Sequence, residues 1–166
     1  MRPHVIIVNG PPGAGKTSVT AQLRLLFPSS VAISGDALRA FAPADVRATL
    51  GGGATYRAAG ALARAYLELG AERVIFDYLC LRAAHVRNFS AALPATVELY
   101  VFTLWPPLDT LLEREQRAQP ARIRTPGVTD SYQEMARNLG ALGEVLDTAT
   151  LDVALAARVI HERCAI

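Results

Sequence analysis

The chain has 166 residues, a length that suits one domain over residues 1–166, and 51% of them are hydrophobic, which excludes intrinsic disorder. A formal net charge of +2 gives no general attraction to nucleic acid. Two cysteines, Cys80 and Cys164, are too few for a disulfide scaffold, so we expect a reducing, cytoplasmic location. No apolar run is long enough for a signal peptide or a membrane span.

Short β-branched runs alternate with longer segments of helical periodicity along the chain. The runs are continuously apolar, as in strands that are covered on both faces of a parallel sheet. This alternation predicts a three-layer α/β fold with right-handed crossovers. In chain order we predict a strand at 4–8, a helix at 16–26, a strand at 31–34, helices at 37–41 and 56–69, a strand at 74–77, a helix at 82–93, a strand at 97–103, helices at 108–117 and 132–142, a strand at 144–147 and a helix at 151–161.

Two segments interrupt the alternation. Three consecutive glycines at 51–53 break a helical region and predict a hinge or a substrate-side loop. Residues 118–129 contain two prolines, a glycine and two arginines, which predicts a mobile connection. We expect a short lid in this second region, at about residues 114–130.

Residues 10–17 read Gly-Pro-Pro-Gly-Ala-Gly-Lys-Thr and match G-x-x-x-x-G-K-[ST] without departure. The motif follows an apolar strand and opens a helix, where backbone amides can wrap a phosphate. Lys16, the single lysine of the sequence, is expected to reach the β- and γ-phosphates of ATP, and the Thr17 hydroxyl to bind Mg²⁺. The context disfavours the alternative, a Gly/Pro-rich turn with an accidental lysine. We assign nucleotide binding to Gly10, Pro11, Pro12, Gly13, Ala14, Gly15, Lys16, Thr17 and Ser18.

A second group of polar residues follows the strand at 31–34, in the sequence Ser-Gly-Asp-Ala-Leu-Arg. In open α/β sheets ligands bind at the carboxyl ends of the strands. Asp36 is expected to accept the proton of an acceptor hydroxyl there, and Arg39, one helical turn on, to steady substrate or phosphate. The alternative is that Asp36 caps the helix at 37–41, and one residue can do both.

Asp77 ends an apolar strand, as do the carboxylates that hold the Mg²⁺ shell in P-loop enzymes. We expect Asp77 to bind the metal and to border the acceptor. The alternative is an aspartate that merely favours the turn after the strand. Tyr56 and Arg57 are further candidates for the acceptor pocket, although Tyr56 suits the core equally well.

Four arginines lie in or after the helix at 108–117: Arg114, Arg117, Arg122 and Arg124. Arginines on a mobile segment can clamp ATP and the charge of the transition state when the segment closes. The alternative is a solvated helix face on which these arginines pair with neighbouring glutamates.

Together these residues resemble the small P-loop kinases, which include chloramphenicol phosphotransferase, gluconate and shikimate kinases, adenylate kinase and polynucleotide 5′-hydroxyl kinase. The resemblance extends over nearly the whole chain and is strongest to the chloramphenicol phosphotransferase and tunicamycin-resistance branch. It is carried by Val-Ile-Ile-Val-Asn-Gly at 5–10, Leu-Gly-Ala-Glu-Arg-Val-Ile-Phe-Asp at 69–77, Val-Phe-Thr-Leu at 101–104, Leu-Leu-Glu-Arg at 111–114 and Val-Leu-Asp-Thr-Ala-Thr-Leu-Asp-Val at 145–153.

The resemblance implies a five-stranded parallel sheet in the order 2-3-1-4-5. It also implies that Asp36 is the acceptor-side base, in a D-x-x-R spacing with Arg39 that is similar to the polynucleotide enzymes. Arg114 matches the arginine that commonly stacks on adenine in the family. The arginines placed in the lid are Arg117, Arg122 and Arg124.

The sequence departs from the family pattern after Asp77. Asp-Tyr-Leu-Cys-Leu-Arg at 77–82 does not match the Asp-Gly-Phe-Pro-Arg of adenylate kinases. In the most similar branch the aspartate is often followed by a second one, whereas Tyr78 stands here. No acceptor motif in the chain names its substrate.

We therefore predict an ATP-dependent phosphotransferase that moves the γ-phosphate to a hydroxyl of a small molecule, with antibiotics among the candidate acceptors. Its cofactors are ATP and Mg²⁺. The alternatives are a nucleoside-monophosphate or polynucleotide 5′-hydroxyl kinase and, from another class, a nucleotide-binding switch. The low net charge disfavours a nucleic acid partner; no membrane partner is expected, and a homodimer is left open.

Overall fold

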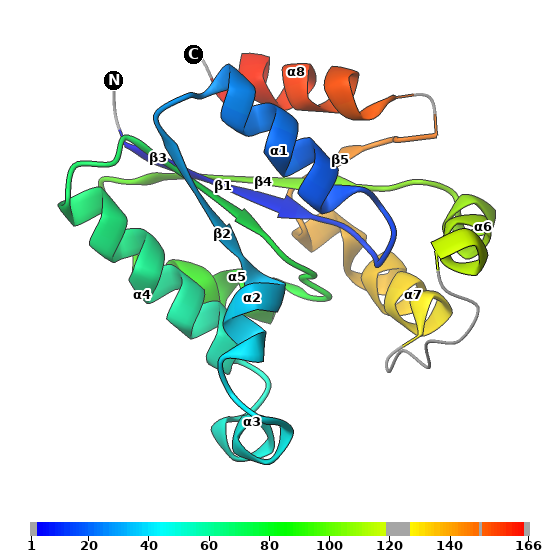
Figure 1. Cartoon of the computed structure of the whole chain (residues 1–166), viewed down its shortest axis with the longest axis horizontal. Helices are drawn as coiled ribbons and strands as arrows, with labels where there is room; N and C mark the ends of the chain where they lie inside the picture. Colours follow the sequence, from blue (N-terminus) through cyan, green and yellow to red (C-terminus); the bar gives the residue numbers. More distant parts are fainter. Residues whose placement is uncertain (1–2, 119–126, 150, 165–166) are drawn as a thin grey trace.

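Five parallel strands form one sheet in the order β2-β3-β1-β4-β5, which confirms the order that the resemblance implies. The computed structural model describes residues 3–118, 127–149 and 151–164. Figure 1 shows the strands, which are β1 (His4–Asn9), β2 (Ser30–Ser34), β3 (Arg73–Asp77), β4 (Glu98–Leu104) and β5 (Glu144–Leu146).

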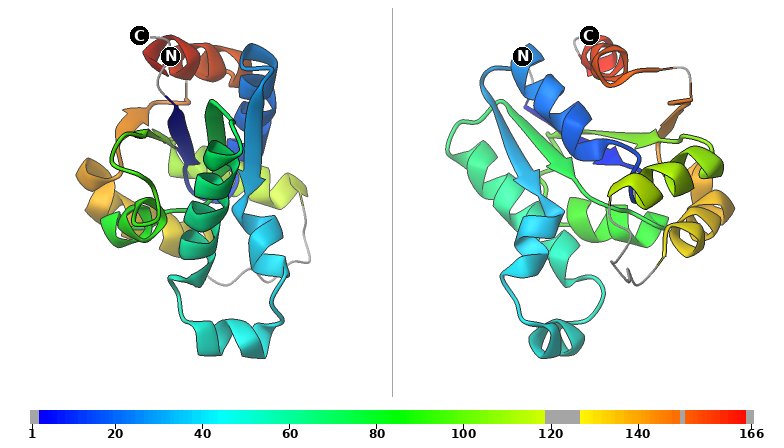
Figure 2. Two further views of the ribbon diagram at one scale, coloured as in Figure 1. Left: turned by 90° about the vertical axis from the view of Figure 1, so that its left-hand side faces the viewer. Right: turned by 45° about the vertical axis from the view of Figure 1, so that its right-hand side comes forward.

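Helices cover both faces of the sheet and complete three layers (Figures 1 and 2). Their bounds are α1 (Lys16–Leu26), α2 (Gly35–Ala40), α3 (Ala44–Leu50), α4 (Ala54–Glu68), α5 (Ala83–Ser90), α6 (Leu108–Ala118), α7 (Val128–Asn138), the 3₁₀ turn η1 (Leu139–Ala141) and α8 (Val153–Cys164). Helices α1 and α8 cover one face, α4 and α5 the other, and α3 projects away from the layers. Within the described ranges, no helix has both the length and the apolar character that a bilayer crossing needs.

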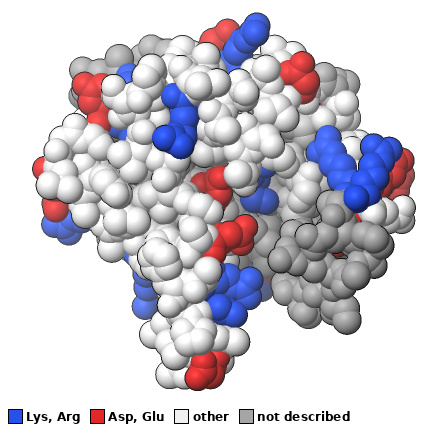
Figure 3. Space-filling model, viewed as in Figure 1, with Lys and Arg blue, Asp and Glu red and all other residues white. Residues whose placement is uncertain are grey.

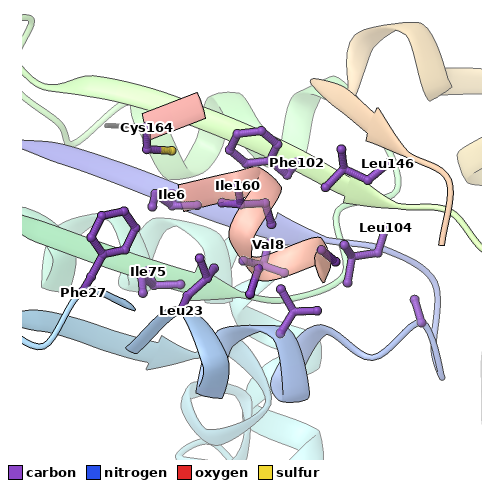
Figure 4. Close-up of a cluster of buried hydrophobic side chains, with 14 of the residues drawn as sticks. Ile6, Val8, Leu23, Phe27, Ile75, Phe102, Leu104, Leu146, Ile160 and Cys164 are labelled. Carbon is purple, nitrogen blue, oxygen red and sulfur yellow. The ribbon is translucent and has the colours of Figure 1, made fainter. Parts of the chain in front are cut away.

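Successive residues of β1 enter two separate cores, because side chains alternate between the faces of a strand. Ile6 and Val8 lie in the core under α1 and α8, which Figure 4 shows with Leu23 and Ile160. Val5 and Ile7 lie in the core under α4 and α5, together with Phe76 and Phe89. All four β1 residues are fully buried, so both faces of this strand are covered as its continuous apolar sequence predicts.

The register of the sheet brings the carboxyl ends of β1, β2 and β3 together. Val8 of β1 and Ser34 of β2 both pair with Asp77 of β3. The segments that follow these strands therefore begin at the same edge of the sheet. This register positions the loop after β1, the start of α2 and Asp77 as one candidate site.

The predicted elements are confirmed in type and order, although several bounds differ by a few residues. Helix α2 begins at Gly35, two residues earlier than predicted, because the Ser34 hydroxyl accepts a hydrogen bond from the Ala37 amide (3.4 Å) and caps the helix. Helix α3 was not predicted. Helix α7 starts at Val128, so it includes the last residues of the predicted connection at 118–129. Residues 119–126, in the middle of the predicted lid, lie outside the described residues.

The two buried phenylalanines under α4 and α5 offer a test of this packing. Phe89 stacks on Phe76 with ring centroids 4.7 Å apart, and both side chains are fully buried. Phe89→Ala should lower the free energy of unfolding by about 3–5 kcal/mol, because it removes aromatic contacts and leaves a cavity. Leu69→Ala, at a position that is 83% exposed, should change it by less than about 0.5 kcal/mol. Urea unfolding measures both values, and equal effects of the two substitutions would contradict the packing.

Candidate active site

The loop between β1 and α1 has the backbone geometry of a phosphate cradle. Gly13 and Gly15 have φ angles of 82° and 93°, in the left-handed region that glycine adopts without a side-chain penalty. Gly15 is also the N-cap of α1 and places no side chain on the amides of the first helical turn. Such amides, at the positive end of the helix dipole, bind anions. The predicted nucleotide loop is therefore present as a backbone structure.

Two cationic side chains contact the carbonyls of this loop. The Lys16 ammonium donates hydrogen bonds to the Gly10 oxygen at 2.9 Å and the Pro11 oxygen at 3.1 Å. Arg114 reaches the loop from α6, and its Nη1 donates to the Gly13 oxygen at 3.0 Å. These contacts place both cations beside the cradle. There they could donate charge-assisted hydrogen bonds to phosphate oxygens, which are stronger than hydrogen bonds between neutral groups.

Asp77 is buried beside the loop, with 6% of its surface exposed. Burial raises the pKa of its carboxyl above the usual range, and the Lys16 ammonium partly offsets this rise. Thr17 lines the same cavity as Asp77. The structure thus brings the two predicted metal ligands together, and their hydroxyl and carboxylate oxygens are ligands of the kind Mg²⁺ prefers.

Asp36 lies in the first turn of α2 but does not cap it. The capping hydroxyl is that of Ser34, so the interpretation of Asp36 as the cap is wrong. The Asp36 carboxylate is exposed and lines a cavity together with Arg39, one turn further along α2. The helix dipole favours an acidic side chain in the first turn, so Asp36 is stable at this position without capping the helix.

A cavity of about 1180 Å³ connects the phosphate cradle to Asp36. Its walls come from the cradle, from α2 and α3, from the first turns of α4 and from the loop that follows β3. Lys16, Thr17 and Asp77 line this cavity together with residues of the α2–α3 segment, residues 35–50. A volume of this size accommodates a small molecule in addition to a phosphate chain.

The loop after β3 is held by two sets of hydrogen bonds. The buried Asn9 side chain accepts from the Cys80 amide at 2.7 Å and donates to the Cys80 oxygen at 3.1 Å. Its Nδ2 also contacts the Thr103 hydroxyl of β4 at 3.1 Å. On the other side, the Tyr56 hydroxyl donates to the Leu79 oxygen at 2.6 Å. The backbone between Asp77 and the cavity wall is therefore fixed from β1, β4 and α4.

Tyr78, the residue that departs from the family pattern, packs on the start of α2. A Cβ atom added to the buried Gly35 would lie 2.2 Å from the Tyr78 ring, so only glycine fits at this position. The Tyr78 and Tyr56 rings are also neighbours, with centroids 5.3 Å apart. The contact fixes the backbone immediately before Asp36 against the residue immediately after Asp77.

Several predicted site residues lie outside the described cavity lining or also have a structural role. Tyr56 lines the cavity but is buried and hydrogen-bonded to the backbone, so it also serves the core. Arg57 is exposed and is not among the described residues that line the cavity. Arg117 is exposed on α6 and lies 3.5 Å from the Glu113 carboxylate, the local pairing that was the alternative for this residue. Arg122 and Arg124 lie outside the described residues.

The sequence predicted Asp36 and Arg39 of α2 for the acceptor site, and it predicted a hinge or substrate-side loop at 51–53, but it did not predict the contribution of α3 to the cavity. Phe41, Arg47 and Leu50 line it and were not singled out. Helix α3 has a recognisable start, since Pro43 is its N-cap and Asp45 lies in its first turn. Its seven residues are too few to show a clear periodicity, and this left only the glycines after it as a signal.

A family model described as an AAA domain matches residues 5–142. The chain belongs to this P-loop family. The match includes β1 to β4 and the whole of the cradle and cavity described above. No curated protein matches the sequence.

Solved structures of a tunicamycin resistance protein and of two kinases share the fold over nearly the full length. The tunicamycin resistance protein of Deinococcus radiodurans is 24% identical, with 99% of this chain and 97% of that chain covered and a TM-score of 0.73. A gluconokinase from Sinorhizobium meliloti is 20% identical (98% and 96% covered, TM-score 0.62). Shikimate kinase from Acinetobacter baumannii is 16% identical (98% and 93% covered, TM-score 0.63). The chain therefore has the fold of the P-loop kinases.

Because the Asp77 carboxyl is buried, we expect its substitution to stabilise the fold and to weaken nucleotide binding. Asp77→Asn should raise the midpoint of thermal unfolding at pH 7 by roughly 2–4 °C, the shift that about 1 kcal/mol gives in a chain of this size. Burial raises the pKa of this carboxyl, so its ionised form is disfavoured in the folded protein. As the pH falls through the pKa of the folded protein and then that of the unfolded chain, Asp77 becomes neutral in both states. The difference in unfolding midpoint between Asp77→Asn and the wild type should then disappear.

Asp45→Asn is the matched control, because Asp45 lies exposed in the first turn of α3 and does not line the cavity. It should change neither the unfolding midpoint nor the affinity for Mg²⁺-nucleotide. Asp77→Asn should weaken that affinity while it stabilises the fold. Two results would contradict this account of Asp77. One is an unfolding midpoint of Asp77→Asn below that of the wild type at pH 7. The other is a difference between the two midpoints that grows as the pH falls.

Proposed function

We propose that the protein is an ATP-dependent phosphotransferase that moves the γ-phosphoryl group to a hydroxyl of a small molecule. The observation that carries the proposal is that Lys16 and Thr17 line the same cavity as Asp36 and Arg39. Phosphoryl transfer is governed by positioning and electrostatics, which requires the donor phosphate and the acceptor hydroxyl in one enclosed space.

The residues of the cradle suit ATP and Mg²⁺. The left-handed glycines and the start of α1 present amides to the phosphates, and Lys16 supplies a positive charge. Thr17 and Asp77 would hold Mg²⁺, which when bound neutralises charge on the β- and γ-phosphates. Thr17 and Asp77 line one cavity, which supports this pairing of oxygen donors.

Asp36 would accept the proton of the acceptor hydroxyl as the hydroxyl attacks the γ-phosphorus. Its carboxylate is exposed to the cavity, and the cap of α2 is supplied by Ser34. Arg39 would orient the acceptor or the transferred phosphoryl group. Arg114, which contacts the Gly13 carbonyl, would bind the nucleotide, and Arg117 of the same helix would add positive charge.

Antibiotics that carry a hydroxyl are among the acceptors we propose, since the fold matches that of a tunicamycin resistance protein over 99% of this chain. Gluconokinase and shikimate kinase, which share the fold, support a small-molecule acceptor in general. A formal net charge of +2 disfavours a nucleic acid substrate, for which phosphate contacts dominate affinity.

Lys16→Ala tests the nucleotide end of the cavity. It should lower kcat for phosphoryl transfer by about 10²–10³-fold, because the transition state loses a preorganised positive charge. The measurement is transfer of γ-labelled phosphate from ATP to an acceptor found by screening pools of hydroxyl compounds. Arg24→Ala, at an exposed arginine of α1 outside the described cavity lining, is the control and should keep wild-type turnover. Turnover near the wild-type level in Lys16→Ala would refute the proposal.

Asp36→Asn tests the acceptor end. It should lower kcat by about 10²–10⁴-fold, since a general base is lost, and leave the dissociation constant for ATP nearly unchanged. Asp45→Asn, at the equivalent first-turn position of α3, should change neither quantity. Loss of ATP affinity in Asp36→Asn, with kcat retained, would show that Asp36 acts at the nucleotide and not at the acceptor.

A further inference from the structure

We infer that His85 is a positioning residue whose neutral imidazole holds the loop after Asp77, residues 78–82, and that protonation of the ring releases this loop. The inference rests on the proposed phosphotransferase function and adds to it a side chain that acts through the backbone. His85 is half-buried in the first turn of α5 and is not among the described residues that line the cavity. The Leu81 amide donates a hydrogen bond to its Nδ1 at 3.1 Å.

This hydrogen bond fixes the protonation state of the ring. Because the Leu81 amide is a donor, Nδ1 of His85 must offer a lone pair, and the proton of the neutral imidazole is on Nε2. In a charged imidazole both nitrogens carry protons, so an N–H group at Nδ1 would point at the N–H group of Leu81. Protonation therefore turns an attractive contact into a repulsive one and leaves a part-buried amide without its acceptor.

His85 adds a third hold on the loop to the two that Asn9 and Tyr56 provide. Asn9 of β1 binds both backbone groups of Cys80. The Tyr56 hydroxyl of α4 donates to the oxygen of Leu79, the preceding residue, at 2.6 Å. The asparagine amide does not titrate, and burial raises the pKa of the Tyr56 hydroxyl. Of these three side chains, His85 is therefore the one that changes its charge near neutral pH.

The imidazole is fixed in turn by the Tyr56 ring. The two rings are stacked, with centroids 4.3 Å apart and an interplanar angle of 18°. Tyr56 is buried and bonded to the same loop, so the stack keeps Nδ1 facing the Leu81 amide. Leu79 and Leu81 both line the cavity. Loss of the bond at Nδ1 would therefore loosen backbone that borders the cavity and leads out of Asp77.

The described titratable groups that face the imidazole are Tyr56 of α4, Arg82 directly before α5 and Glu134 of α7. Arg82 and Glu134 form an ion pair, so their effects on the ring oppose each other. Burial and the Arg82 guanidinium lower the pKa of the His85 imidazole, and the Glu134 carboxylate partly offsets this. The ring is therefore neutral at pH 7 and takes up its proton in mildly acidic solution.

Two substitutions separate the acceptor at position 85 from its titration. His85→Asn keeps a side-chain oxygen that can accept from the Leu81 amide and does not titrate, whereas His85→Leu has no acceptor at any pH. The measurement is transfer of γ-labelled phosphate from ATP to the pool of hydroxyl compounds that the wild type labels most, from about pH 8 down to about pH 5.

The cavity has carboxyl groups of its own, which also take up protons in acid. Acidic side chains lie beside basic ones in the middle of the face that Figure 3 shows, next to α2. Asp36 and Asp77 line the cavity and are unchanged in every variant, so their protonation lowers all rates alike. The ratio of each variant's rate to the wild-type rate at the same pH therefore isolates the contribution of His85.

The two ratios should change in the same direction from different starting values. At about pH 8, His85→Leu should transfer phosphate about tenfold more slowly than the wild type, because a loop that borders the cavity is misplaced. Towards about pH 5 the wild type loses the same bond, and this ratio should approach one. The ratio of His85→Asn to the wild type should rise about tenfold over the same range, since only the wild type loses its hold.

His161→Asn and His161→Leu are the matched controls. His161 lies on α8 against Phe27, with ring centroids 4.6 Å apart, and is not among the described residues that line the cavity. Both ratios to the wild type should stay constant with pH. Equal rates of His85→Leu and the wild type at about pH 8 would overturn the positioning role. A His85→Asn ratio that does not change with pH would overturn the role of protonation.

Hydrogen exchange of the backbone at residues 78–82 tests the hold on the loop without any acceptor. After correction for the intrinsic effect of pH, exchange should be about tenfold faster in His85→Leu than in the wild type at about pH 8, and the difference should vanish towards about pH 5. Equal exchange in the two proteins at about pH 8 would overturn the inference even where phosphoryl transfer is found. Faster exchange together with no Lys16-dependent transfer would support the hold on the loop and count against the phosphotransferase proposal.

Discussion

The buried side chain of Asn9 makes the contacts on which the site depends. Asn9 is the last residue of β1, directly before the phosphate cradle, and its amide binds both backbone groups of Cys80 and the Thr103 hydroxyl. An unpaired amide in this dry position would be costly, so the three partners are held strongly together. One side chain thereby ties the strand that leads into the cradle to the loop that follows Asp77.

The acceptor side is built by a second set of local constraints. Ser34 supplies the cap of α2, and Gly35 leaves room for the Tyr78 ring. Together these contacts allow Asp36 to face the cavity instead of the helix backbone. The parallel register between Ser34 and Asp77 then sets the two carboxylates on either side of one space. The proposed proton acceptor and the proposed metal ligand are thus placed by backbone geometry rather than by flexible loops.

The sequence predicted the parts of the site that are contiguous in the chain. The phosphate cradle is one uninterrupted motif, and Asp77 ends a clearly apolar strand. The sequence left Asp36 open as an alternative cap of α2, because serine and aspartate are both good caps and an offset of two residues leaves no trace in the pattern. Phe41 and Leu50 read as ordinary apolar residues, since only their exposure in the folded chain distinguishes them from core. Arg57 was predicted to face the pocket but is not among the described lining residues. The rotation of α4 about its own axis depends on packing against Phe89 and the sheet, which the local sequence does not reveal.

The central claim is that one cavity joins a nucleotide to an acceptor hydroxyl and passes a phosphoryl group between them. The most direct measurement is ³¹P NMR of the products formed from ATP, Mg²⁺ and pools of small hydroxyl compounds. The account predicts a new phosphate monoester resonance that grows with ADP and is absent with Lys16→Ala. Formation of inorganic phosphate alone, from every pool and at the same rate without acceptors, would contradict it and identify the protein as an NTP hydrolase.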